Sequence, residues 1–98
     1  GTNSVATANM LKAGAKYGAS GENPVVVACR DADYIIGPIG IIMADSMLGE
    51  ISPLMAQAVG ASNAHKILIP INKCLTVAGV QNLTLSDYIK IAVDSIQV

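Results

Sequence analysis

The apolar stretch over residues 33–50 constrains the fold more than any other part of the chain. It opens with Tyr34, Ile35 and Ile36, a run of aromatic and β-branched residues that Gly37-Pro38 ends. A run without polar alternation is typical of a central parallel strand whose two faces are both covered. We therefore expect one buried strand here, with the other elements arranged to cover it.

Length and composition predict one domain over residues 1–98 that leaves apolar surface uncovered. A chain of 98 residues is long enough for a core of two or three layers. Apolar residues make up 52% of it and charged residues 13%, which is little charge to cover a small sphere. We expect a homo-oligomer, or association with a further N-terminal segment, because residues 1–4 look like a loop that leaves a strand. The 98 residues would then be the C-terminal part of a longer natural chain.

Charge and hydropathy exclude several classes of partner. The net charge is −1 and the six Lys and Arg are scattered, which argues against nucleic acid. No apolar run reaches the roughly 18 residues of a membrane span, and no basic and then apolar leader is present, so we expect a cytoplasmic protein. Cys29 and Cys74 have no partner at a metal-ligand spacing, so we expect reduced thiols and no metal site. No motif identifies a cofactor.

Capping residues predict five helices, because Ser, Thr and Asn favour helix N-caps and Pro favours the first turn. Asn3 or Ser4 caps a helix over residues 5–13. Pro24 begins one over residues 25–32, with a strand over residues 25–29 as the alternative. The others are a short buried helix over residues 41–48 ended by Gly49, a helix over residues 53–59 after Ser52, and a last helix from Thr84 to Ile96.

Two further strands are predicted, over residues 66–71 and, at an edge, over residues 75–80. Helices that alternate with apolar strands predict an α/β fold with a parallel sheet and helices on both faces. A parallel sheet of two or three strands is small. It again indicates a further N-terminal strand, or strands from another chain.

Four segments resemble a family of short bacterial proteins classified as a domain of unknown function: residues 1–3, 21–23, 37–51 and 66–70. The resemblance covers nearly the whole chain. It implies a Rossmann-like three-layer sandwich with a parallel sheet, which in the family opens with a strand, a Gly-rich turn, a helix and a second strand. That opening unit has no counterpart here, so the resemblance implies a fold that is incomplete at the N-terminus. The Gly-rich phosphate-binding turn corresponds to no residue of this chain.

Three segments follow strands, and ligands of open α/β sheets bind beyond the carboxyl ends of strands. These segments are residues 1–3, 37–40 and 71–74. We expect them to converge on a pocket for a nucleotide or a small anionic metabolite, held by backbone N–H groups near residues 37–40. A tight turn between buried elements is the alternative there. The ligand-binding candidates are Thr2, Asn3, Gly37, Pro38, Gly40, Asp45, Ser46, Asn72 and Lys73.

Asp45-Ser46 interrupts an apolar stretch, where a carboxylate must be paired, hydrogen-bonded or directed into a cleft. A carboxylate that caps the helix after Ser52, or that is simply exposed, is the alternative. Glu50 has the same two interpretations.

Two other functions stay open at this point. One is a small enzyme that uses Asp45 as acid or base with Lys73 or Cys74, although no catalytic residue is identified. The other is an oligomeric structural or interaction protein without catalysis, with Met43, Met47 and Met55 at or near the subunit contact.

Overall fold

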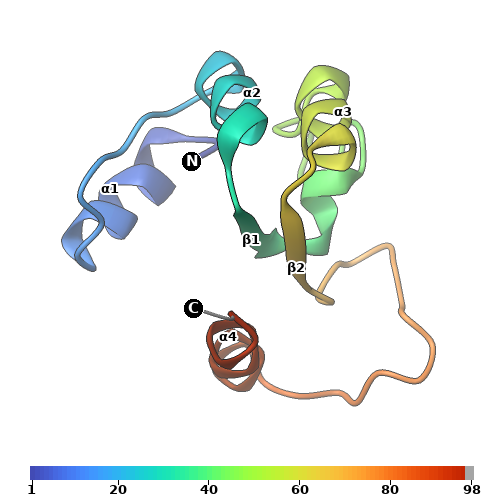
Figure 1. The fold of residues 1–98 in the computed structure, drawn as a ribbon. Helices are drawn as coiled ribbons and strands as arrows, with labels where there is room; N and C mark the ends of the chain where they lie inside the picture. Colours follow the sequence, from blue (N-terminus) through green and yellow to red (C-terminus); the bar gives the residue numbers. More distant parts are fainter. Residues whose placement is uncertain (97–98) are drawn as a thin grey trace.

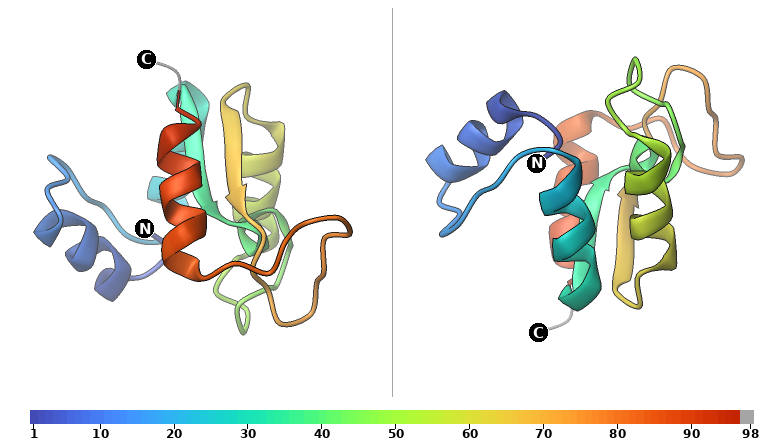
Figure 2. Two further views of the ribbon diagram at one scale, coloured as in Figure 1. Left: turned by 90° about the horizontal axis from the view of Figure 1, so that it is seen from below. Right: turned by 90° about the horizontal axis from the view of Figure 1, so that it is seen from above.

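The computed structural model describes residues 1–96 and is built around two parallel strands (Figure 1). β1 and β2 pair from Tyr34 opposite His65 to Pro38 opposite Ile69. Helices α2 and α3 lie over one face of this pair and α4 lies against the other (Figures 1 and 2). The elements in chain order are α1 (Ser4–Lys12), α2 (Glu22–Asp31), β1 (Tyr34–Pro38), the 3-10 helix η1 (Ile39–Ile42), α3 (Pro53–Ala61), β2 (His65–Ile69) and α4 (Leu85–Asp94).

The predicted α/β class is confirmed, and so is the parallel pairing of the two principal strands. Helices cover both faces of the pair, as the order of elements indicates. Over the described residues the sheet has two strands, which does not by itself establish a Rossmann-like three-layer sandwich.

Side-chain caps begin three of the helices, as predicted. The side chain of Asn3 accepts from the Ala6 N–H, that of Ser52 from the Met55 N–H, and that of Thr84 from the Asp87 N–H. The second helix begins at Glu22, so the alternative of a strand over residues 25–29 is wrong. These starts could be read from the sequence because a cap involves only residues three positions apart.

The expectation of a strand buried on both faces is wrong. β1 is half-buried, and Ile36 is 44% exposed. On a strand, alternate residues face opposite sides of the sheet. Gly37 faces η1, because a Cβ on it would lie 3.1 Å from Ile41 Cδ1, so Ile36 faces the side of α4. α4 packs mainly on β2, which leaves this part of β1 open.

The helix predicted over residues 41–48 is also wrong. The chain makes the short η1 and then a run of turns in which Asp45, Met47 and Leu48 have positive φ angles of 64°, 56° and 57°. The backbone bonds close a loop instead, from the Asp45 N–H to the Ile51 carbonyl at 2.7 Å and from the Ile51 N–H to the Ser46 carbonyl at 3.3 Å. Gly49 adopts a positive φ of 83°, as a terminating glycine would. The apolar side chains of this segment favoured a buried helix, yet Leu48 is fully exposed at the loop tip.

The strand predicted over residues 75–80 does not form. The segment after β2 makes an isolated antiparallel bridge between Asn72 and Leu75 and then a turn at residues 78–79. Gly79 has a φ of 83°, which suits a turn and not a strand.

A small core lies between α2, η1 and α3. Ile51, Met55 and Ala56 form its buried cluster, and Val25 and Ile41 pack against them. Ile51 stands directly before the N-cap of α3, where an apolar residue packs against the fourth residue of the helix, here Ala56. Ile51 is 1% exposed, so it anchors α3 to the rest of this cluster.

The expected place of Met55 in a subunit contact is wrong, because its side chain is 4% exposed and belongs to the core. Met43 is partly buried and Met47 is 42% exposed, so these two can still meet a partner. α1, unlike α3, is largely exposed: it buries only Thr7 among its residues, and its apolar side chains Val5, Met10 and Leu11 are exposed. No helix within residues 1–96 has the length and apolarity needed to cross a bilayer.

Candidate functional site

The segments that follow β1 and β2 meet at Gly40. This glycine is buried, and a Cβ built on it would lie 3.1 Å from Asn72 Nδ2 and 3.3 Å from Ser46 Oγ. Both distances are tighter than most Cβ contacts, so a larger residue at position 40 would require the two polar side chains to shift. Because the strands are parallel, their carboxyl ends share one edge of the sheet, and three of the predicted site residues come together there.

Hydrogen bonds fix two of these side chains. Ser46 Oγ donates to the Gly40 carbonyl at 2.5 Å, which ties the loop over residues 43–50 to η1. Asn72 Oδ1 accepts from the Cys74 N–H at 2.9 Å, so the other atom of the amide, Nδ2, is turned toward Gly40. The Asn72 amide is therefore held with its Nδ2 donor at the carboxyl end of the strands.

Glu50 connects the same loop to the N-terminus of α1. Its Oε1 atom accepts from Thr2 Oγ1 and from Asn3 Nδ2, the second at 2.7 Å. Asn3 also caps α1 through Oδ1, which accepts from the Ala6 N–H at 2.8 Å. The carboxylate thus lies among donors at the positive end of a helix.

The two donors lower the pKa of Glu50 below its ordinary value, the bond from Thr2 having the larger effect and the bond from Asn3 the smaller. Slight burial opposes them weakly. Hydrogen bonds to a carboxylate favour its ionised form, so Glu50 stays an anion at this edge. Of the two acidic residues weighed in the sequence, Glu50 and not Asp45 makes the contacts.

The remaining predicted residues take different places. Asp45 is exposed on the turn of positive φ, and Lys73 is exposed directly after Asn72. Gly37 packs closely against Ile41, which fits the tight turn that was the alternative, and Pro38 is exposed at the end of β1. The nine predicted residues therefore fall into a group that makes contacts at the edge, a group of exposed neighbours, and Gly37, which packs against η1.

The contacts do not support the enzyme hypothesis. No hydrogen bond among the described residues joins the Asp45 side chain to Lys73 or Cys74, and Cys74 is exposed. Within residues 1–96, no group of three or more His, Cys, Asp or Glu side chains lies close enough to hold a metal ion.

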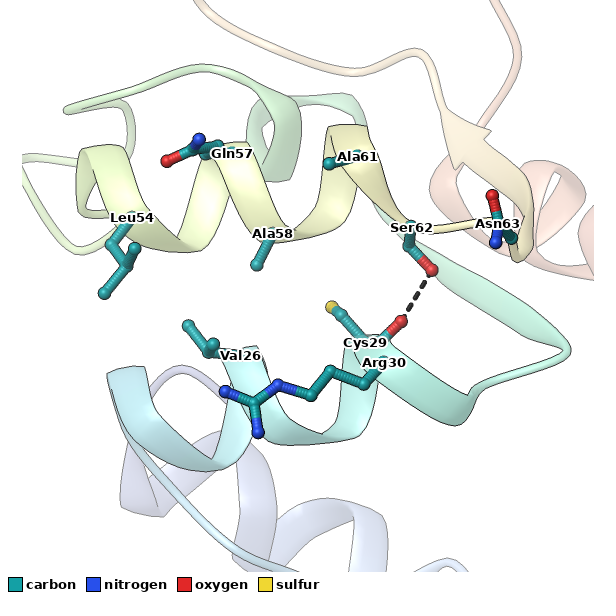
Figure 3. A pocket seen from close by; sticks show the side chains of 9 residues that line it. All are labelled: Val26, Cys29, Arg30, Leu54, Gln57, Ala58, Ala61, Ser62 and Asn63. Carbon is teal, nitrogen blue, oxygen red and sulfur yellow. Dashed lines mark hydrogen bonds between the residues drawn. The ribbon is translucent and has the colours of Figure 1, made fainter.

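Two hollows are lined by other residues, and none of the nine predicted residues lines either of them. One, of about 420 Å³, separates α2 from α3 and is shown in Figure 3. The other, of about 330 Å³, lies between β2, the segment before α4 and α4 itself. The sequence did not indicate them because each is a gap between apolar faces, and apolar periodicity says only that a face is covered.

The hollow between α2 and α3 contains the thiol of Cys29, which points into the space between the helices (Figure 3). Its polar lining already holds the helices together: Ser62 Oγ donates to the Cys29 carbonyl at 2.7 Å, and Lys66 Nζ donates to the Ser62 carbonyl at 2.7 Å. Burial raises the pKa of the Cys29 thiol, and nearby Lys66 offsets this in part. The thiol is therefore protonated at neutral pH and unsuited to act as a nucleophile.

The fold and this edge define a small α/β protein in which loops after two parallel strands meet. Over residues 1–98 the sequence matches the family model described as "Domain of unknown function (DUF3842)", and the chain belongs to that family. Comparison with curated proteins and with solved structures gave no match. The resemblance to a domain of unknown function is thereby confirmed, whereas its bacterial and Rossmann-like features stay predictions.

Proposed function

We propose that the chain binds a small anionic ligand, such as a nucleotide or another phosphate-bearing metabolite, at the carboxyl edge of β1 and β2. The observation that carries this proposal is the meeting of Asn72, Ser46 and Gly40. A site for an anion needs fixed donors, and the Nδ2 group of Asn72, whose Oδ1 atom is held by the Cys74 N–H, is such a donor. Lys73 adds a positive charge beside Asn72.

The bonds of Glu50 support the same ligand chemistry. Thr2 and Asn3 donate to a carboxylate, so their geometry suits an anionic oxygen. An anion that enters must compete with Glu50 for these donors. The variant Glu50→Gln keeps the size of the side chain but removes its charge, and we expect it to bind the anion more tightly.

Calorimetry with inorganic phosphate, AMP and ATP tests the proposal. Asn72→Asp keeps the Oδ1 atom that accepts from the Cys74 N–H but replaces the donor at the edge by a second carboxylate oxygen. We expect it to weaken binding at least about tenfold, because a buried or partly buried charge repels an anion. Asn63→Asp is the matched control, since Asn63 is exposed in the turn before β2, at the far end of the strand.

Three results would count against the site. They are no heat of binding with any of the three anions at millimolar concentration, equal weakening by the two Asn→Asp variants, and weaker anion binding by Glu50→Gln. The first result would exclude these anions as ligands. The other two would show that Asn72 and Glu50 do not have the proposed roles in binding.

A further inference from the structure

The loop over residues 43–50 has an unfavourable backbone conformation. Asp45, Met47 and Leu48 have positive φ angles of 64°, 56° and 57°, which glycine adopts without a steric penalty and other residues do not. Asp tolerates this region better than the bulkier Met and Leu. Leu48 is fully exposed, so no packing of its side chain offsets the strain. Other contacts must therefore hold the loop in this form.

Two side-chain contacts fasten the loop to the rest of the chain. Near its start, Ser46 Oγ donates to the Gly40 carbonyl. At its end, the Glu50 carboxylate accepts from Thr2 and Asn3, which stand directly before α1. Hydrogen bonds to an ionised group are roughly twice as strong as bonds between neutral groups. The bonds of the carboxylate are therefore the stronger of the two fastenings.

The fastened loop covers part of the proposed anion site. A Cβ built on Gly40 would lie 3.3 Å from Ser46 Oγ and 3.6 Å from Met47 Cγ, so both residues of the loop lie over this buried glycine. The Ser46 hydroxyl has one proton, which it donates to the Gly40 carbonyl, and the Thr2 hydroxyl donates its proton to the loop. An anion can accept from these two hydroxyls only after the loop has moved.

We propose that the loop over residues 43–50 is a latch on the anion site, which Glu50 closes against the strain of the backbone and which the bound anion opens. This inference rests on the proposed function. An anion that accepts from Thr2 and Asn3 displaces the Glu50 carboxylate and repels it, so the anion binds the open form better than the closed form. Once the loop is released, its two bulky residues can return to negative φ, and this relief of strain favours opening.

Hydrogen exchange of two amides, measured by NMR, reports whether the latch is closed. The Asp45 N–H donates to the Ile51 carbonyl and the Ile51 N–H donates to the Ser46 carbonyl, so both amides exchange faster when the loop opens more often. Saturating inorganic phosphate should speed their exchange at least about fivefold, because the open form then dominates. Sodium chloride at the same ionic strength is the control and should leave both rates as they are.

A variant opens the latch without any ligand. Thr2→Val removes one donor to the Glu50 carboxylate and should speed the exchange of the same two amides about fivefold, which corresponds to the loss of one hydrogen bond. Thr76→Val makes the same substitution at an exposed residue in the segment before α4, and it should leave both rates unchanged.

Two substitutions of Leu48 test the strain. Leu48→Gly removes the steric penalty of the positive φ, whereas Leu48→Ala removes the same exposed side chain but keeps the Cβ that causes the penalty. The closed form is therefore favoured in Leu48→Gly. We expect the two amides to exchange at least about threefold more slowly in Leu48→Gly than in Leu48→Ala, and phosphate to bind more weakly by a similar factor.

Calorimetry of the same proteins distinguishes a failure of the latch from a failure of the proposed function. Phosphate that binds while both amides exchange at the same rate or more slowly would overturn the latch and leave the anion site in place. No binding of phosphate, AMP or ATP would overturn both. Equal exchange in Leu48→Gly and Leu48→Ala, or unchanged exchange in Thr2→Val, would also overturn the latch, because strain or Glu50 would then have no part in it.

Discussion

Helices α3 and α4 begin in the same way and end in different surroundings. Each is capped by a hydroxyl side chain, from Ser52 and from Thr84. α3 buries Met55, Ala56 and Val59 against α2 and η1, whereas α4 buries Tyr88 and Ala92 and leaves most of its apolar residues exposed. The difference shows that a helix can be specified locally while its burial depends on which other elements are present to cover it.

The largest expected effect distinguishes the core around α3, which is packed against α2 and η1, from α4, which is largely exposed. Ile51→Ala should lower the free energy of unfolding by about 2–5 kcal/mol, because Ile51 is 1% exposed and its loss leaves a cavity in the core. Ile91→Ala removes the same atoms from a residue of α4 that is 53% exposed, and it should change stability by no more than about 0.5 kcal/mol. Urea unfolding of the two variants measures both, and similar losses would mean that α4 is packed as tightly as α3.

The alkylation rates of the two cysteines test the same comparison, and we expect an effect of intermediate size. Cys29 is 6% exposed between α2 and α3, and burial raises the pKa of its thiol, whereas Cys74 is exposed in the segment before α4. Since the thiolate is the reacting form, Cys74 should be alkylated at least about tenfold faster than Cys29 at pH 7.5. Mass spectrometry of peptides after timed iodoacetamide treatment gives the two rates. Equal rates would show that α2 and α3 separate readily, so that the core around α3 would not be packed more tightly than the segment before α4.

The smallest expected effect concerns Glu50, which ties α1 to the loop after η1. Its pKa is lowered in the folded chain, so its contribution to stability is present above the ordinary carboxyl pKa of 4.5 and is lost as pH falls through the lowered value. The contribution is no more than about 1 kcal/mol, because water screens a partly exposed group. Glu50→Gln should therefore lose less stability than the wild type between pH 6 and pH 3.

Titration of the Glu50 carboxyl by NMR tests whether the hydrogen bond from Thr2 lowers its pKa. Thr2→Val removes the donor with the larger effect and should move the pKa of Glu50 back toward its ordinary value. Thr76→Val, a change at an exposed residue in the segment before α4, is the control and should leave the Glu50 titration as it is. An unchanged Glu50 pKa in Thr2→Val would show that the hydroxyl does not hold this carboxylate.

Several parts of the candidate site could be predicted from the sequence. Gly40 and Asn72 were candidates because they follow strands, and parallel strands bring their carboxyl ends to one edge. Ser46 was a candidate because it interrupts an apolar stretch. Asp45 and Glu50 had the same two interpretations in the sequence, and only Asp45 was among the ligand-binding candidates. The fold distinguishes them, since Glu50 meets Thr2 and Asn3 across 47 or more residues of chain.

The sequence determined those features of the chain that depend on neighbouring residues: the helix N-caps at Asn3, Ser52 and Thr84, and the left-handed conformation of Gly49. A cap or a turn closes over three or four residues, so its chemistry is present in a short segment. Only the tertiary structure decided that residues 43–50 form a loop, that residues 75–80 form no strand, and that β1 is half-buried. Apolar side chains show that a segment favours burial, but whether it is buried depends on distant segments that must pack against it.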